Sequence, residues 1–175
     1  MYERILLFNV SGLGDFIELV RFIEAIRAKY IDSSIVLVCS DKYYSYAKNC
    51  PYVNKILPWP VKKDKAFVLS RIIFYFSIVL KLRKYKFDLM INFNELGSLK
   101  SAFMVKYLTW FINPKITIGR NTNGLGEFYN LYVEDNFKLK KSENEYYKEI
   151  VKLIGVDQVN LYPNLWGRNV VDNLQ

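Results

Sequence analysis

The sequence contains no histidine, and this absence restricts the chemistry that the chain can perform. Histidine is the commonest general base near neutral pH and the commonest ligand of zinc. Any transfer of a proton must therefore fall to a carboxylate, a lysine, a tyrosine or a cysteine.

Cysteine is scarce as well. The chain has only Cys39 and Cys50, and their spacing fits neither a zinc site nor a redox motif. Arg4 is followed by an apolar run too short for a signal peptide and by no small-residue cleavage pattern. We therefore expect two reduced thiols in a cytoplasmic protein.

A long hydrophobic run is also missing. The most apolar stretch, residues 66–82, is interrupted by Ser70, Arg71, Ser77 and Lys81. A membrane-spanning helix needs roughly 20 consecutive apolar residues. The sequence thus predicts no transmembrane segment, and we expect any contact with a membrane to be peripheral.

Acidic residues are outnumbered, with 17 of them against 25 lysines and arginines, which gives a formal net charge of +8. This charge favours an anionic partner, which could be nucleic acid, an anionic membrane surface or a phosphorylated substrate. The sign of the charge does not choose among the three. Because no nucleic-acid-binding motif accompanies it, we expect no nucleic acid as partner.

The chain has 175 residues, 51% of them hydrophobic, which suffices for one domain with a substantial core. Short branched apolar runs alternate with stretches of helical periodicity, as is typical of a parallel sheet with helices on both faces. We predict an α/β fold, a Rossmann-like, doubly wound, mainly parallel sheet flanked by helices. The predicted strands are 4–10, 34–39, 53–57, 87–93 and 115–118. The first predicted helix ends near residue 30, and the other four span 42–48, 66–85, 99–111 and 142–153.

The segments between these elements set the expected organisation. Two prolines in residues 58–60 predict an interruption of regular structure. Residues 121–127 are mostly polar residues and glycine, which predicts a mobile loop. We expect residues 1–160 to form the domain and residues 161–175 to be a linker or the start of a further domain.

The turn Asn9-Val10-Ser11-Gly12-Leu13-Gly14-Asp15 joins the first strand to the first helix. A dinucleotide-binding fingerprint requires a third glycine, but Ile17 stands at that position. Asp15 also places a negative charge where a pyrophosphate would bind the helix amides, so nucleotide binding at this turn is disfavoured. Asp15 is then either a first-turn carboxylate that contributes roughly 0.3–1 kcal/mol through the helix dipole, or a general base.

Ligands of doubly wound sheets bind outside the carboxyl ends of the strands. The opening turn, Asp41, the basic loop 61–65, Asn94 with Glu95, and Arg120 all follow predicted strands. We therefore expect these features to converge on one crevice.

Several segments resemble the N-terminal half of the family 9 glycosyltransferases, the heptosyltransferases that build the inner core of bacterial lipopolysaccharide. The resemblance rests on the Ser-x-x-Gly-Asp turn and on a Pro-Tyr-Val segment at residues 51–53. Together with their flanks, the similar segments are 5–15, 49–56, 87–93 and 116–120.

The resemblance implies a GT-B architecture, in which two Rossmann-like domains face each other across a cleft. The N-terminal domain receives the acceptor, and the C-terminal domain binds a nucleotide sugar such as ADP-heptose, so the donor site would lie outside this chain. Such enzymes are inverting and need no catalytic metal or other cofactor. The resemblance assigns the catalytic base to Asp15, and it assigns acceptor binding to Ser11, Gly12, Gly14, Lys62, Lys63, Lys65 and Arg120.

The partners implied are an anionic glycan or glycolipid acceptor, a C-terminal domain or partner chain, and the inner face of the cytoplasmic membrane. Without its donor-binding domain the chain would be inactive. A solvated surface remains an alternative role for the three lysines.

An alternative function is a non-catalytic module that binds anionic glycolipid or a membrane surface. Phe67, Phe74, Tyr75 and Phe76 in the predicted helix 66–85, beside the basic loop, would suit an interface. We favour the burial of this helix in the core, because helices of such folds cover the sheet.

Overall fold

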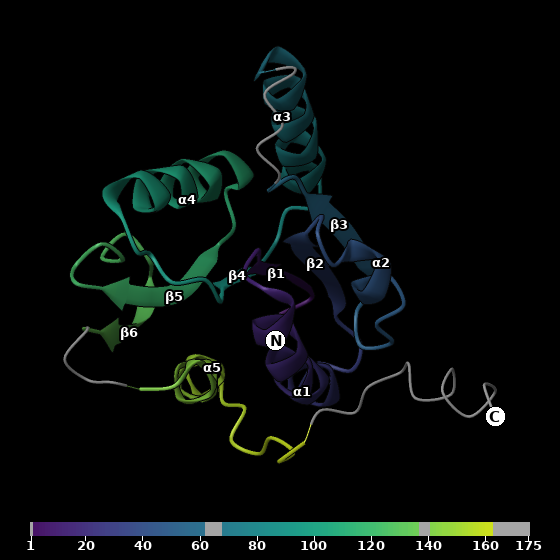
Figure 1. Cartoon of the computed structure of the whole chain (residues 1–175). Helices are drawn as coiled ribbons and strands as arrows, with labels where there is room; N and C mark the ends of the chain where they lie inside the picture. The colour runs from purple at the N-terminus through teal and green to yellow at the C-terminus, as the bar shows by residue number, and fades with distance from the viewer. Residues whose placement is uncertain (1, 62–67, 137–140, 163–175) are drawn as a thin grey trace.

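A sheet of parallel strands forms the centre of the molecule (Figure 1). The computed structural model describes residues 2–61, 68–136 and 141–162. In this part of the chain the strands are β1 (Arg4–Asn9), β2 (Ser34–Ser40), β3 (Lys55–Trp59), β4 (Leu89–Asn92), β5 (Ile116–Thr122) and β6 (Leu131–Asp135). Their order in the sheet is β3-β2-β1-β4-β5-β6, and all five pairs are parallel. The predicted doubly wound, Rossmann-like fold is confirmed.

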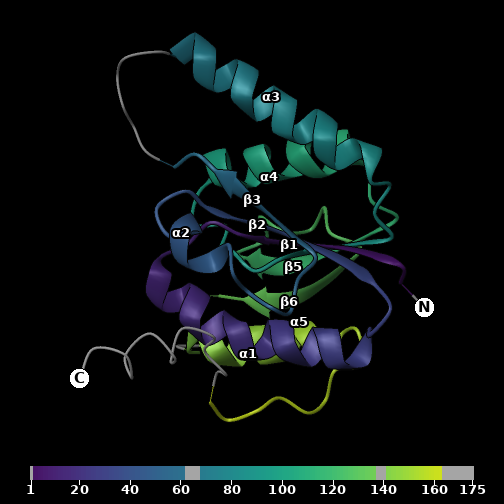
Figure 2. The same ribbon diagram turned by 90° about the vertical axis from the view of Figure 1, so that its right-hand side faces the viewer.

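Helices cover both faces of this sheet (Figure 2). One layer holds α1 (Leu13–Lys29), α2 (Tyr44–Ala47) and α5 (Glu143–Lys152), and the other holds α3 (Val68–Lys84) and α4 (Leu99–Ile112). Ile5 and Leu7 of β1 pack toward the first layer, whereas Leu6 and Phe8 pack toward the second. Successive side chains of a strand point to opposite faces, so a strand buried on both sides must be apolar throughout.

The edge strand β3 extends further than expected. It includes Pro58 and Trp59, although the sequence analysis predicted an interruption there. That prediction was wrong because an edge strand tolerates a proline, which has no N–H to donate, at positions that need no ladder hydrogen bond. Trp59 is buried, and its ring meets that of Phe8 edge-on with centroids 5.4 Å apart.

The predicted mobile loop 121–127 is also corrected. Asn121 and Thr122 belong to β5, and after a series of turns the chain forms β6, a strand that the sequence analysis missed. Parallel strands usually need a connection of a dozen residues or more, commonly a helix. Residues 123–130 make this connection with turns alone.

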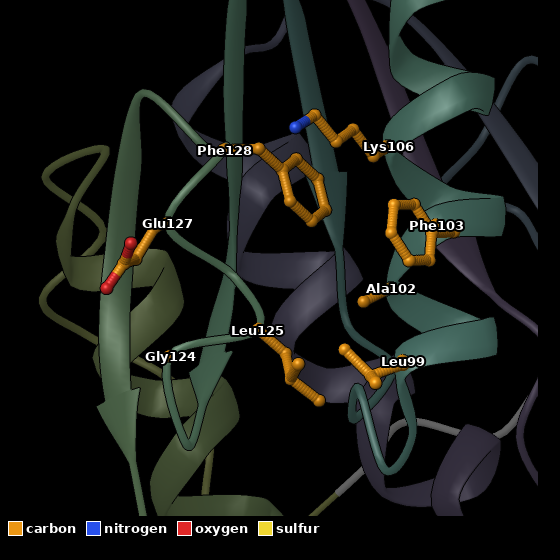
Figure 3. A pocket seen from close by; sticks show the side chains of 8 residues that line it. All are labelled: Leu99, Ala102, Phe103, Lys106, Gly124, Leu125, Glu127 and Phe128. Carbon is orange, nitrogen blue, oxygen red and sulfur yellow. The ribbon is translucent and has the colours of Figure 1, made fainter.

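Two glycines allow this short connection to pack closely. A Cβ on Gly119 would lie 2.4 Å from the ring of Tyr129, and one on Gly126 would lie 2.2 Å from the carbonyl oxygen of Arg120. Leu125 and Phe128 then pack beside Ala102, around a shallow pocket of about 210 Å³ between the connection and α4 (Figure 3).

The predicted last helix is confirmed, and its ends follow the expected signals. The Ser142 hydroxyl accepts a hydrogen bond from the Glu145 amide (3.3 Å), and the Glu145 carboxylate accepts one from the Ser142 amide (2.7 Å). This capping box satisfies two amides that the helix itself leaves unpaired. Gly155, with a φ of 74°, lies just beyond the helix.

A search of the described helices for one both long and apolar enough to span a bilayer finds none. Residues 163–175, which belong to the expected linker or further domain, lie outside the described residues.

Gly126→Ala should destabilise the protein by about 1–3 kcal/mol, because the new methyl group would force the backbone of β5 and the connection apart. Denaturant-induced unfolding would measure the loss. Gly14→Ala is the control, since its Cβ would meet nothing within 4 Å and alanine is the better helix former. A Gly126→Ala protein as stable as the wild type would contradict the close packing described above.

Candidate functional site

A pocket at the carboxyl ends of β1 and β4 brings together residues from distant parts of the chain. It has a volume of about 290 Å³, and we call it the Asp15 pocket. Its lining consists of Val10, Ser11, Asp15, Phe93, Asn94, Glu95, Glu143 and Tyr147. This is where a doubly wound sheet binds its ligands.

The turn after β1 is held from two sides. Asn9 is fully buried, and its Oδ1 accepts hydrogen bonds from the Ser11 hydroxyl (2.9 Å) and from the Tyr43 hydroxyl (2.7 Å). The Val10 amide donates to Asn94 Oδ1 at 2.7 Å, which ties the turn to the end of β4. Ser11 therefore supports the shape of the turn besides lining the pocket.

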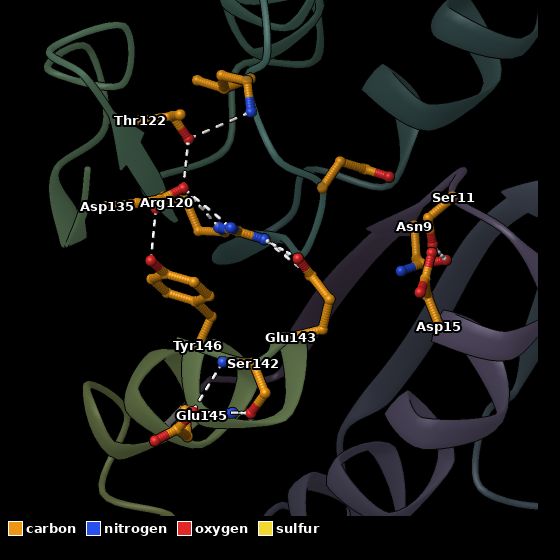
Figure 4. Close-up of polar contacts among 12 residues, drawn as sticks. Asn9, Ser11, Asp15, Arg120, Thr122, Asp135, Ser142, Glu143, Glu145 and Tyr146 are labelled. Carbon is orange, nitrogen blue, oxygen red and sulfur yellow. Dashed lines mark hydrogen bonds and ion pairs between the residues drawn. The ribbon is translucent and has the colours of Figure 1, made fainter. Parts of the chain in front are cut away.

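The two carboxylate oxygens of Asp15 have different surroundings. Oδ2 accepts a hydrogen bond from the Gly12 amide at 3.1 Å, at the start of α1. Oδ1 has no hydrogen-bond partner among the described residues. Figure 4 shows Asp15 beside Asn9 and Ser11 at the end of β1. The helix-cap role is thus present, and it leaves one oxygen for a ligand in the pocket.

Two polar side-chain atoms near the turn are buried. Within the described part of the chain, neither Asn9 Nδ2 nor the Tyr147 hydroxyl makes a well-formed hydrogen bond, although the Asn9 side chain lies close enough to the hydroxyl to lower its pKa slightly. The Tyr147 ring is fixed edge-on between Phe22 and Phe93, with centroids 5.7 and 5.4 Å away. Buried polar groups in proteins are nearly always hydrogen-bonded. Of these two residues Tyr147 lines the Asp15 pocket and Asn9 does not, so the tyrosine is the one placed to meet a ligand.

The Tyr147 hydroxyl keeps its proton at neutral pH. Burial raises its pKa, and the nearby carboxylates of Glu143 and Asp15 raise it further. The hydroxyl can therefore donate a hydrogen bond to a ligand oxygen in the Asp15 pocket.

Beside the pocket lies a buried ion network centred on Arg120 (Figure 4). Arg120 of β5 is 2% exposed, and its Nη1 donates to both carboxylate oxygens of Glu143 at 2.9 and 2.7 Å. Its Nη2 and Nε donate to Asp135 Oδ2 at 2.9 and 3.2 Å. The guanidinium also lies over the Tyr146 ring, 3.9 Å from the centroid. The network joins β5, β6 and the start of α5.

The charges in this network stabilise one another. Burial alone would raise the pKa of Asp135, but hydrogen bonds from Tyr146 and Thr122 and the charge of Arg120 hold it below its usual value. Burial likewise opposes the charge on Arg120, whose pKa is nevertheless raised by Glu143 and Asp135. Both groups are charged at neutral pH.

A second pocket of about 180 Å³ adjoins the first and shares Glu95 and Glu143 with it. The Asp15 pocket itself is lined by three carboxylates, those of Asp15, Glu95 and Glu143, and by no lysine or arginine among the described residues. Carboxylates accept hydrogen bonds from hydroxyl groups and repel anions. The pocket therefore suits the hydroxyl groups of a sugar better than a phosphate.

No group of three or more cysteine, aspartate or glutamate side chains in the described ranges is arranged to hold a metal ion.

The predicted site residues fall into four groups. Ser11 and Asp15 line the pocket, and Gly12 supplies the amide that Asp15 binds. Gly14 is exposed in the first turn of α1 and does not line the pocket. Lys62, Lys63 and Lys65 lie outside the described residues.

Arg120 forms the fourth group, because its carboxylate partners already occupy its guanidinium. An anionic acceptor would have to compete with Glu143 for it. Direct binding by Arg120 stays a prediction.

Sequence reasoning did not identify Glu143, Tyr147 and Asp135 as site residues. Glu143 and Tyr147 lie on a helix that was predicted correctly, but its position against the β1 turn depends on tertiary packing. Asp135 ends the strand that was missed. The available signal was a carboxylate at the start of a helix and a tyrosine one turn later, on the same face.

No model of a protein family and no curated protein matches the sequence. Solved structures do match the fold. One is a family 9 glycosyltransferase from Veillonella parvula, with a TM-score of 0.69 and 22% identity over 89% of this chain and 42% of that one.

Two Escherichia coli structures are also similar. The heptosyltransferase WaaC with ADP has a TM-score of 0.68 and 18% identity over 87% of this chain and 48% of its own. The ADP-heptose lipopolysaccharide heptosyltransferase II has a TM-score of 0.62 and 18% identity over 93% and 46%. The chain thus shares its fold with these proteins and spans about half their length.

Asp135→Asn should lower the free energy of unfolding at pH 7 by about 3–5 kcal/mol, because it leaves a buried arginine incompletely paired. The folded pKa of Asp135 is depressed, so its contribution is present above the pKa of an unfolded aspartate and is lost as the pH falls through the folded value. The difference between variant and wild type should therefore shrink in acid, as measured by denaturant unfolding across this pH range.

The control is Glu134→Gln on the same strand, where the side chain is exposed and the change should stay within about 0.5 kcal/mol. Equal stability losses in the two variants would contradict a special role for the buried ion pair.

Proposed function

We propose that the chain is the acceptor-binding part of an inverting, metal-independent glycosyltransferase of the family 9 type, with Asp15 as the general base. The observation that carries this proposal is the position of Asp15. One of its oxygens is fixed by the Gly12 amide, while the other is left for a ligand in a pocket that Tyr147 also lines. The fold shared with family 9 and heptosyltransferase structures supports the same conclusion.

In the proposed reaction an acceptor hydroxyl donates a hydrogen bond to Asp15 Oδ1. The acceptor oxygen attacks the anomeric carbon of a nucleotide sugar, and its proton passes to Asp15. The bond from that carbon to the diphosphate breaks on the opposite side, so the nucleoside diphosphate leaves with the electron pair and the configuration inverts. A carboxylate is a suitable base for this step in a chain without histidine.

The other pocket residues would position the acceptor. The Tyr147 hydroxyl would donate to a sugar oxygen, and Glu95 and Glu143 would accept from neighbouring hydroxyls. Ser11 and Asn94 would hold the turn. Anionic groups of the acceptor would have to bind outside the Asp15 pocket, and Lys62, Lys63 and Lys65 remain the predicted residues for this.

The donor would bind to a second domain or partner chain across the cleft. The similar structures are about twice as long as this chain, and the carboxylates of the Asp15 pocket would repel a diphosphate. We propose a heptose-like sugar as donor group and a lipopolysaccharide-core type acceptor, in the cytoplasm at the inner face of the membrane. Without its donor-binding domain the chain should not transfer sugar.

Asp15→Asn should reduce turnover by about 10²–10⁴-fold in the intact enzyme, because the amide cannot take the proton. The amide oxygen can still accept the Gly12 hydrogen bond, so folding and acceptor affinity should change little. Transfer from ADP-heptose to a lipopolysaccharide-core acceptor would be measured under single-turnover conditions.

The matched control is Glu18→Gln, an exposed carboxylate about one turn further along α1, which should keep full turnover. If Asp15→Asn also kept full turnover, Asp15 would be a helix cap alone.

Tyr147→Phe should leave the free energy of unfolding within about 0.5 kcal/mol of the wild type, because its hydroxyl makes no well-formed hydrogen bond that would be lost. It should weaken acceptor binding by up to about tenfold, as expected for one lost hydrogen bond. Isothermal titration of the acceptor and thermal unfolding would give the two values.

Tyr43→Phe is the matched control, because the Tyr43 hydroxyl donates to the backbone and side chain of Asn9. This variant should lose about 1 kcal/mol of stability. A Tyr147→Phe protein that lost as much stability and bound the acceptor normally would refute the assigned role.

A further inference from the structure

The layer formed by α3 and α4 carries a large exposed apolar surface. On α4, Trp110 is 69% exposed, Leu99 66%, Tyr107 59% and Phe103 55%. Phe76 of α3 is 56% exposed, although the sequence analysis favoured burial of that helix in the core. Scattered apolar side chains are normal on a protein surface, but a contiguous patch of this kind marks an interaction site.

The helix α4 has apolar side chains on its outer as well as its inner face. Ala102, Val105 and Leu108 face the core, while large apolar side chains lie on the outer face beside Lys100 and Lys106. The outer face of a surface helix is normally polar. With 14 residues it is about 21 Å long, too short for the roughly 30 Å of a bilayer core. It can lie on an apolar phase but cannot cross one.

The outer surface continues across the gap between the two helices, which lie side by side above the sheet (Figure 2). A groove of about 380 Å³ is lined chiefly by Tyr75, Phe76 and Val79 of α3 and by Met104, Tyr107 and Phe111 of α4. Its lining is predominantly apolar. The exposed side chains of both helices thus form one surface, which we call the α3–α4 face.

The charges on these helices have a single sign. Neither α3 nor α4 contains an aspartate or a glutamate, whereas Lys81, Lys84, Lys100 and Lys106 are exposed on them. Among the residues around the shallow pocket beside α4, Glu127 of the β5–β6 connection is the one carboxylate. Aromatic side chains together with lysines are the composition of surfaces that lie in a membrane interface.

We propose that the α3–α4 face binds the surface of a membrane that contains anionic lipids. The aromatic side chains would enter the boundary between headgroups and acyl chains, and the lysines would meet the lipid phosphates. This proposal does not depend on the proposed sugar transfer. It rests on the apolar and basic α3–α4 face, whereas sugar transfer was argued from the acidic Asp15 pocket.

A second copy of the chain is a less suitable occupant. A two-fold contact places the same surface on both sides. Lysines of one copy would then face the lysines of the other, with no carboxylate on α3 or α4 to offset the repulsion.

Sedimentation with lipid vesicles tests the proposal. The chain should bind vesicles of phosphatidylcholine with about one third phosphatidylglycerol and should bind vesicles of phosphatidylcholine alone much less. Raising the salt concentration should weaken the binding. Trp110→Ser should reduce partitioning by about tenfold, and Lys100→Glu with Lys106→Glu should remove the preference for anionic vesicles.

Ile31→Ser is the matched control. Ile31 is 70% exposed, close to the value of Trp110, but follows α1 in the opposite layer. Its variant should bind vesicles as the wild type does, and thermal unfolding should show that all variants are folded.

Three results would overturn the proposal. The first is no binding to anionic vesicles at low salt, and the second is equal binding by the Trp110→Ser and wild-type proteins. The third is a dimer that Trp110→Ser dissociates in sedimentation equilibrium, in the absence of vesicle binding, which would assign the α3–α4 face to a second copy.

Discussion

The buried ion network of Arg120 fixes the side of the crevice that faces the β1 turn. A guanidinium that is 2% exposed is tolerated because Asp135 and Glu143 both bind it. The two carboxylates come from the end of β6 and the start of α5. Their attraction to Arg120 therefore holds the first turn of α5 against β5 and β6. Glu143 and Tyr147 then reach the Asp15 pocket from that helix. The geometry of the pocket thus depends on a charge outside it.

The sequence allowed the first five strands and all five helices to be predicted, because they carry apolar periodicity or capping signals. It did not allow β6 to be predicted. In β6 only Val133 and Asp135 are buried. The apolar Leu131 and Tyr132 are exposed while an aspartate is buried, so neither alternation nor a continuous apolar run marks the segment as a strand. Its connection depends on contacts at Gly119 and Gly126 that no local pattern reveals. The burial of Arg120 could not be predicted either, because it depends on partners that are 15 and 23 residues away in the chain.

The net charge of +8 conceals a separation of charge between surfaces. Carboxylates line the described crevice, while the helices of one layer carry lysines and no acidic residue. A strongly basic chain therefore has a pocket suited to hydroxyl groups. From the sequence the charge is visible only as a property of the whole chain, and basic residues were expected at the acceptor site. The Asp15 pocket does not carry this charge, and Arg120 and Lys141, which line the adjoining pocket, are paired with carboxylates.

The two roles considered for Asp15, helix cap and general base, are compatible. Binding the Gly12 amide with Oδ2 restricts rotation of the carboxylate, and the buried Asn9 holds the preceding turn through Ser11 and Tyr43. A base must be held close to the proton that it removes, and a fixed carboxylate loses less entropy when the acceptor binds. The hydrogen bond that caps the helix is therefore also what orients Oδ1. In a chain without histidine, this is a direct way to position a base at the end of the first strand.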